Sequence, residues 1–86
     1  EAASLPTELL AVKDWLIGVA LVEKEPGRVR ASFRSKDASV VDVSKIAAAF
    51  GGGGHALAAG ALIISTLAEA KAKVVEAIGT AFSGQK

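Results

Sequence analysis

Cysteine is absent from this 86-residue sequence, and histidine occurs only once. The lack of cysteine excludes a disulfide framework and a zinc knuckle. A dinuclear metal centre needs several convergent carboxylate and imidazole ligands, which a single histidine cannot supply. Asp14, Asp37 and Asp42 are scattered along the chain and are interpreted as loop and cap residues. We therefore expect no metal site and no catalytic residue within this chain.

Excess charge and long apolar runs are also lacking. Ten basic and nine acidic residues give a net charge of +1, so any contact with nucleic acid must come from a local patch. No apolar run reaches the ~20 residues needed to cross a membrane, and the start of the chain does not resemble a signal peptide. We expect a cytoplasmic protein that does not contact the membrane.

The length predicts one small domain over residues 1–86. Because the chain begins at Glu1 without methionine, we expect it to be a piece of a longer protein. Hydrophobic residues make up 51% of the sequence, which permits an uncovered apolar face that docks on another surface.

The N-terminal half predicts a short helix followed by a hairpin. Pro6 and the apolar residues up to Val12 favour the helix, with proline in or before its first turn. Leu16–Val22 is almost continuously apolar, as in a buried strand. A turn is predicted at Glu25–Gly27. The strict alternation of Arg28–Arg34 predicts the second strand, with Val29, Ala31 and Phe33 on one face.

The C-terminal half predicts a loop over Lys36–Asp42, with a short strand at Ser39–Val41, and a helix over Lys45–Phe50 capped by Ser44. Gly51 is expected to end this helix, and Ala61–Ile64 is predicted to be a strand. Thr66 and Glu69 form a capping box for a final helix that runs to about Phe82. Its predicted buried stripe is Leu67, Ala70, Val74, Ile78 and Phe82, and Glu69 is expected to pair with Lys73. The predicted fold class is α+β, a small mixed sheet with helices packed on it.

Four consecutive glycines, Gly51–Gly54, precede the single histidine, His55. Such a run costs backbone entropy on folding, and it allows successive N–H groups to form a nest for an anion. A short helical turn beginning at His55 would add its positive end to that site. The alternative is a flexible connector, although the apolar flanks on both sides favour a loop inside the domain.

The polar face of the predicted Arg28–Arg34 strand presents Arg28, Arg30, Ser32 and Arg34 about 6.6 Å apart. Arg34 stands where the strand ends, and its guanidinium offers a planar fork to a phosphate. A solvated outer face explains Arg28 and Arg30 better, and both interpretations remain open for Arg34. Trp15 is interpreted as a core or domain-contact residue, with base stacking as the alternative.

Three segments, Val29–Lys36, Val41–Ala47 and Phe50–Gly60, together resemble the DHHA1 domain of the DHH phosphoesterase superfamily. They carry a serine–hydrophobic–Arg-Ser-Lys strand end, a short Ile-Ala helix and the pattern GGGGH–x–x–Ala-Ala-Gly. The resemblance covers about residues 16 to 82. It is most similar to the bacterial bifunctional oligoribonuclease and 3′-phosphoadenosine 5′-phosphate phosphatase branch, often called nanoRNase.

The resemblance implies a two-domain parent enzyme that hydrolyses phosphate esters of short RNA or nucleoside bisphosphates. A DHH domain, absent from this chain, would hold two manganese ions, and this chain would bind the nucleotide and close over it. On that pattern Arg34 and His55 match phosphate-contacting positions, Gly52, Gly53 and Gly54 match a phosphate loop, and Ser32 and Ser35 lie beside them. The expected partners are short RNA or nucleotide phosphates, the DHH domain and a second copy of the parent.

Other members of the same superfamily offer alternatives. A RecJ-type single-strand DNA exonuclease would normally carry a longer basic track, and cyclic-di-AMP phosphodiesterases tend to have Asn-Ala-Ala where this chain has Ala58-Ala59-Gly60. Two further alternatives are the C-terminal tRNA-binding domain of an alanyl-tRNA synthetase and a free-standing nucleotide-binding module. The histidine-bearing glycine motif favours the phosphoesterase over the synthetase.

Overall fold

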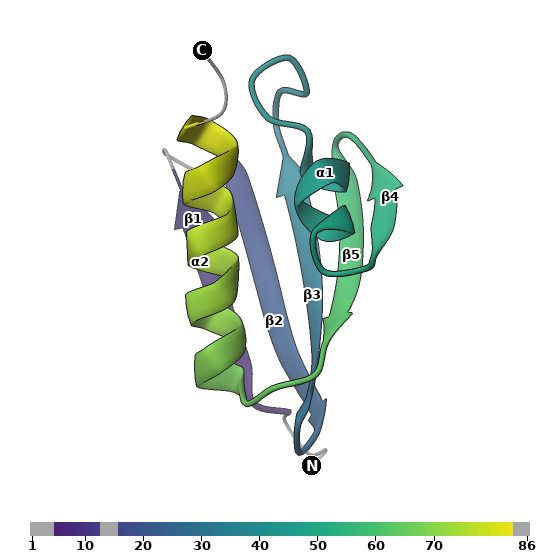
Figure 1. Ribbon diagram of the computed structural model, residues 1–86, viewed down its shortest axis with the longest axis vertical. Helices are drawn as coiled ribbons and strands as arrows, with labels where there is room; N and C mark the ends of the chain where they lie inside the picture. Colours follow the sequence, from purple (N-terminus) through teal and green to yellow (C-terminus); the bar gives the residue numbers. More distant parts are fainter. Residues whose placement is uncertain (1–4, 13–15, 84–86) are drawn as a thin grey trace.

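The computed structural model describes residues 5–12 and 16–83, which form a single sheet covered on one face by helices (Figure 1). The five strands follow the order β1-β2-β3-β5-β4, and every pair is antiparallel. The elements are β1 (Thr7–Val12), β2 (Ile17–Glu25), β3 (Arg28–Ser35), α1 (Val43–Ala48), β4 (Gly53–His55), β5 (Ala58–Ile63) and α2 (Leu67–Ser83). The predicted α+β class is confirmed, although no parallel pair occurs among the described strands.

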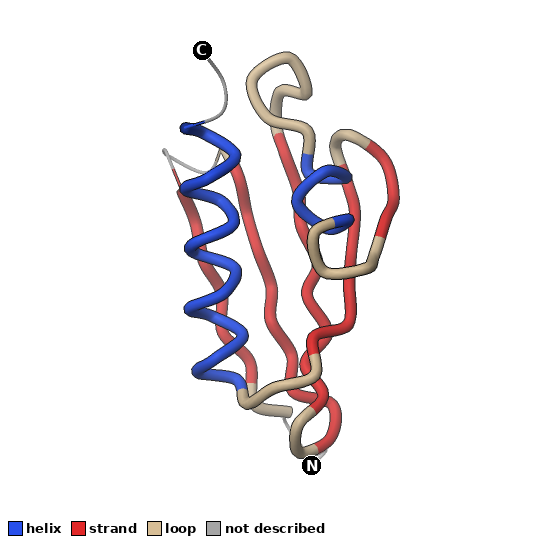
Figure 2. Tube along the Cα trace, viewed as in Figure 1, coloured by secondary structure: helices blue, strands red, loops and turns tan. Residues whose placement is uncertain are grey.

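The core lies between the sheet and the two helices, which pack on the same face (Figure 2). Strand alternation sends every second residue of β2, β3 and β5 into this core. Phe33, Leu21 and Ile17 are fully buried there, and α2 contributes Ala70, Val74 and Ile78. Neither of the two described helices lies on the opposite face of the sheet (Figure 1).

The predicted hairpin is confirmed. β2 and β3 pair from Ile17 opposite Ser35 to Glu25 opposite Arg28, and Pro26 and Gly27 form the turn between them. Gly27 takes a φ of 84°, which favours glycine at this position. Val29, Ala31 and Phe33 are all buried, as the alternating pattern predicts.

The helix predicted from Pro6 to Val12 is wrong, because the structure has strand β1 there. All six residues of β1 pair with β2, from Thr7 opposite Val22 to Val12 opposite Ile17. Leu10 and Val12 pack against the core, whereas Leu9 is exposed. Pairing with an available sheet edge therefore overrides a local pattern that fits either element.

Helix α1 begins two residues earlier than predicted. Its N-cap is Asp42, not Ser44, and the Asp42 side chain accepts a hydrogen bond from the Ser44 backbone N–H at 2.9 Å. The short strand predicted at Ser39–Val41 is wrong. Instead Val40 N–H and Val41 N–H both donate to the Asp37 carbonyl, which makes the segment a turn.

The capping box of α2 is confirmed in both directions. The Glu69 N–H donates to Thr66 Oγ1 at 3.1 Å, and the Thr66 N–H donates to Glu69 Oε1 at 3.3 Å. Glu69 makes no ion pair with Lys73, contrary to the prediction. The ion pair found among the described residues joins Lys71 to Glu8 of β1. Strand β5 begins at Ala58, three residues before the predicted start.

Three predictions concern residues or side chains outside the described structure. Trp15 and Asp14 lie outside the described residues, and so does the Phe82 side chain of the predicted stripe. The other four positions of that stripe do face the core, with Leu67 partly buried and the remaining three buried.

The capping box yields a first prediction. Replacing Thr66 by alanine should lower the free energy of unfolding by about 1 kcal/mol, because the Glu69 N–H loses its acceptor. Thr80→Ala is the matched control, since Thr80 is exposed within α2 and alanine has the higher helix propensity. Denaturant titration of both variants measures the difference. Equal stability of the two variants would contradict the role of Thr66.

Candidate functional site

Arg34 and His55 lie in one transverse row of the sheet. Arg34 of β3 is opposite Ala58 of β5, and His55 of β4 is opposite the same Ala58. The two flanking Cα atoms are therefore about 9.6 Å apart, twice the strand spacing. Residues that are directly opposite in a sheet project from the same face. Both side chains thus border the space above the small Ala58 side chain, and a ligand there can contact both.

This row lies on the face without helices. Phe33 points into the core, so its neighbour Arg34 points away from it. Arg34 and His55 are both exposed. The Arg34 guanidinium makes one long hydrogen bond, from Nη1 to the Phe33 carbonyl at 3.3 Å. Within the described residues no carboxylate forms an ion pair with it, so its charge is available to an anion.

The glycine run does not form the predicted nest. Gly51 takes a φ of 81°, and its N–H donates to the Ala48 carbonyl at 3.0 Å. The Gly52 N–H donates to the Ala47 carbonyl at 2.9 Å. Together these bonds form the Schellman pattern that ends α1, as predicted for Gly51. Two of the four amides therefore satisfy helix carbonyls and cannot bind a phosphate.

The rest of the run is strand β4, which also replaces the helical turn predicted at His55. β4 forms the edge of the sheet, next to β5. The backbone groups on the outer side of an edge strand are not used by the sheet. Gly53 and Gly54 lie on this edge, beside His55, with no Cβ to shield the backbone. Because successive N–H groups of a strand point to opposite sides, one of these two amides points away from the sheet.

The structure accounts differently for the presence of glycine at each position of the run. A Cβ on Gly52 would lie 2.1 Å from the Gly60 carbonyl oxygen, and one on Gly54 would lie 2.6 Å from Ala59 Cα. Gly54 also has a φ of 144°. Gly53 has open space around the same position and an ordinary φ. Close packing on β5 thus explains Gly52 and Gly54, whereas it leaves Gly53 unexplained.

The family of the chain follows from a comparison of its sequence with known domains. A family model for the DHHA1 domain matches residues 1–84. The chain belongs to the DHHA1 domain family. This domain is associated with DHH phosphoesterases. A comparison with curated proteins found no match. Neither helix in the described part of this DHHA1 domain has the length and hydrophobicity to span a membrane.

The two predicted serines have different environments in the DHHA1 domain. Ser35 is buried, donates from Oγ to the Val41 carbonyl at 2.9 Å and accepts from the Asp37 N–H at 3.2 Å. Its hydroxyl therefore fixes the loop after β3 and is not free for a ligand. Ser32 is half-buried on the face that carries Arg34, opposite Ala20 and Gly60.

The loop after Arg34 is also held by two aspartates, in line with their interpretation as loop and cap residues. Asp37 Oδ1 accepts hydrogen bonds from the hydroxyl of Ser39, at 2.6 Å, and from its N–H, at 3.0 Å. Asp42 accepts from the hydroxyl and N–H of Ser44. In each case the side-chain hydrogen bond to serine is the main cause that lowers the pKa of the aspartate. Both are therefore occupied in the turn and the helix cap.

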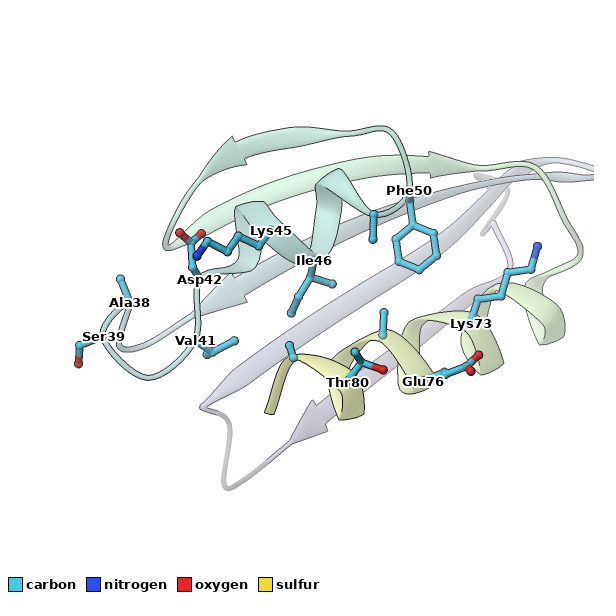
Figure 3. Close-up of a pocket in the computed structure, with 13 residues that line it drawn as sticks. Ala38, Ser39, Val41, Asp42, Lys45, Ile46, Phe50, Lys73, Glu76 and Thr80 are labelled. Atoms are coloured by element: carbon cyan, nitrogen blue, oxygen red, sulfur yellow. The ribbon is translucent and has the colours of Figure 1, made fainter. Parts of the chain in front are cut away.

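A groove of about 830 Å³ lies between α1 and α2 (Figure 3). Val41, Ile46 and Phe50 contribute apolar side chains to it, and its rim mixes acidic with basic residues. None of the predicted site residues lines this groove. It lies on the helical side of the sheet, away from Arg34 and His55.

A second groove, of about 590 Å³, lies on the side of the sheet that carries Arg34. The residues that line it are Leu9, Gly18, Val19, Ala20, Ser32, Arg34, Ser35 and Lys36. Leu9, Gly18 and Ala20 were not among the predicted site residues. Leu9 was missed because a helix was predicted over β1, and Gly18 and Ala20 because their apolar run predicted a strand buried on both faces, whereas both are half-buried. Strict alternation in β2 would have placed Gly18 and Ala20 on one face of the strand and the buried Ile17 and Val19 on the other.

The glycine geometry predicts two contrasting variants. Gly54→Ala should destabilise the domain strongly, by more than about 2 kcal/mol, because the methyl group collides with β5 at a backbone angle that alanine avoids. Gly53→Ala should change stability by less than about 0.5 kcal/mol, since nothing contacts its Cβ position. Thermal and denaturant unfolding of both variants measure this contrast. Similar losses of stability in the two variants would contradict the close contact between Gly54 of β4 and strand β5.

The serine environments predict a second contrast. Ser35→Ala should cost about 1–3 kcal/mol of unfolding free energy, because the buried Val41 carbonyl loses its donor. Ser32→Ala should have little effect on stability, since Ser32 makes no side-chain hydrogen bond within the described structure. The comparison uses denaturant unfolding at neutral pH. If Ser35→Ala is as stable as the unmodified chain, the Ser35 hydroxyl does not hold the loop and is free for ligand binding.

Proposed function

We propose that this domain binds the phosphate of a nucleotide between Arg34 and His55. The observation that carries the proposal is the shared transverse row, which directs a guanidinium and an imidazole to one patch of the helix-free face. Arginine binds phosphate through charge-assisted hydrogen bonds, and histidine can donate a further hydrogen bond. The exposed Gly53 and Gly54 backbone on the adjacent edge allows close approach to the same anion.

The proposal extends to a larger enzyme. We propose that this domain binds substrate for a metal-dependent phosphoesterase, and that a DHH domain of the parent holds two manganese ions and activates water. Among the described residues of this chain, no three His, Asp or Glu side chains form a cluster suited to a metal ion. In this arrangement Arg34 and His55 orient the phosphate, and the other domain supplies the chemistry.

The proposed substrates are short oligoribonucleotides or nucleoside bisphosphates, the ligands of the nanoRNase branch. The glycine–histidine motif followed by Ala-Ala-Gly supports this branch. The sheet adds a physical reason for the last motif residue, because a Cβ on Gly60 would lie 3.1 Å from the Ala31 carbonyl oxygen. The proposed partners are the nucleotide, the DHH domain and a second copy of the parent.

The test is a titration of the chain with 3′-phosphoadenosine 5′-phosphate, in which binding is measured from the changes in amide chemical shifts in NMR spectra. Arg34→Gln should weaken binding about ten- to a hundredfold, as expected for a lost charge-assisted hydrogen bond. Arg28→Gln is the matched control, since Arg28 lies on the same strand but is opposite Glu25 at the hairpin end. The control should bind as well as the unmodified chain.

The identity of the residues whose amide signals shift on binding also tests the proposal. The amides of Gly53, Gly54 and His55 should move on binding, together with those around Arg34. Equal losses for Arg34→Gln and Arg28→Gln would mean that a diffuse basic face binds the ligand. If only residues of the groove between α1 and α2 show shifts, the site lies on the helical face of the sheet and the proposal is overturned.

A further inference from the structure

The second groove adjoins Arg34 on the side away from His55. Across the sheet, Leu9 of β1 is opposite Ala20 of β2, which is opposite Ser32 of β3. In the next row on the same face, two residues along each strand, Gly18 is opposite Arg34. The groove therefore runs over β2, with β1 on one side and β3 on the other. Its occupant would lie directly beside a phosphate held by Arg34.

The side chains explain why the sheet is hollowed here. Gly18 and Ala20 have small or no side chains, so the surface over β2 lies lower than its surroundings. Leu9 stands beside it as an apolar wall and is 68% exposed, more than any other large hydrophobic residue described. An exposed leucine at the edge of a groove is suited to contact the apolar surface of a ligand.

The charge at the groove is of one sign. Arg34 and Lys36 line its β3 side, and none of its described lining residues is acidic. Its volume of about 590 Å³ is typical of sites for small molecules. The groove thus favours a ligand that has an apolar, flat part and an anionic end, and a nucleotide has both.

We propose that this groove binds the nucleobase and ribose of the nucleotide whose phosphate contacts Arg34. The base lies over Gly18 and Ala20 and packs against Leu9. The Ser32 hydroxyl lies in the groove, where it can form a hydrogen bond with the polar edge of the base. This inference rests on the proposed function, because the phosphate fixes one end of the ligand. It makes Leu9 a determinant of the preference for nucleotides over other phosphates.

The experiment compares adenosine 5′-monophosphate with ribose 5-phosphate, which has the same phosphate and sugar but no base. The unmodified 86-residue chain should bind the nucleotide more tightly. Leu9→Ala should weaken nucleotide binding about three- to tenfold, since it removes apolar surface buried by the base, and should leave ribose 5-phosphate binding unchanged. Leu62→Ala is the matched control, because Leu62 is also exposed, at 46%, but does not line the groove.

A second variant tests the floor of the groove. Ala20→Val fills space above β2 with a residue that favours strands, so it should weaken nucleotide binding and spare ribose 5-phosphate. Unfolding curves for all variants confirm that each is folded at the titration temperature.

The outcomes separate the two proposals. Equal affinity of the unmodified chain for both ligands, with Arg34→Gln still weakening both, would overturn the base site and leave the phosphate site standing. Equal losses for Leu9→Ala and Leu62→Ala would likewise overturn the role of Leu9. Binding that is insensitive to Arg34→Gln would overturn the phosphate site and, with it, this inference.

Discussion

The close contact between the glycine segment and β5 is the constraint on which the candidate site depends. Gly52 and Gly54 approach the β5 backbone so closely that a Cβ on either residue would collide with it. This approach lets β4 pair with β5 and places His55 opposite Ala58. The same contact ties α1 to the sheet, because the Gly51 and Gly52 N–H groups donate to carbonyls in the last turn of α1. One short segment thus ends a helix, completes the sheet and positions an imidazole.

Strand β3 joins the core to the site. Phe33 is fully buried beneath the helices, whereas Arg34 projects from the other face, and Ser35 returns to the interior to hold the following loop. Because successive side chains alternate between faces, a shift of one residue in the register would bury the arginine and expose the phenylalanine. The hydrophobic core therefore specifies the position of the charged group. This explains how a small domain fixes the face from which a candidate binding residue projects.

Several features followed from local patterns alone. The hairpin, the alternation of β3 and the capping box of α2 each depend on residues close together in the sequence, so their signals are strong. The prediction for β1 failed because its apolar residues suit a helix or a strand, and only the free edge of β2 decides between them. The predicted nest failed for a similar reason. Glycine permits many backbone shapes, and the carbonyls of α1 together with the edge of β5 select the one observed.

The sequence by itself determined that this chain is a small α+β domain with the motif of the DHHA1 family, and it singled out Arg34 and His55. These conclusions rest on residue types and spacing, which are local properties. Only the tertiary structure decided that the two residues share a row across β5, that Ser35 belongs to the interior, and that Leu9 borders a groove with Arg34. Strand pairing brings together residues far apart in the chain, and the register of β1, β4 and β5 is set by packing that no local pattern contains.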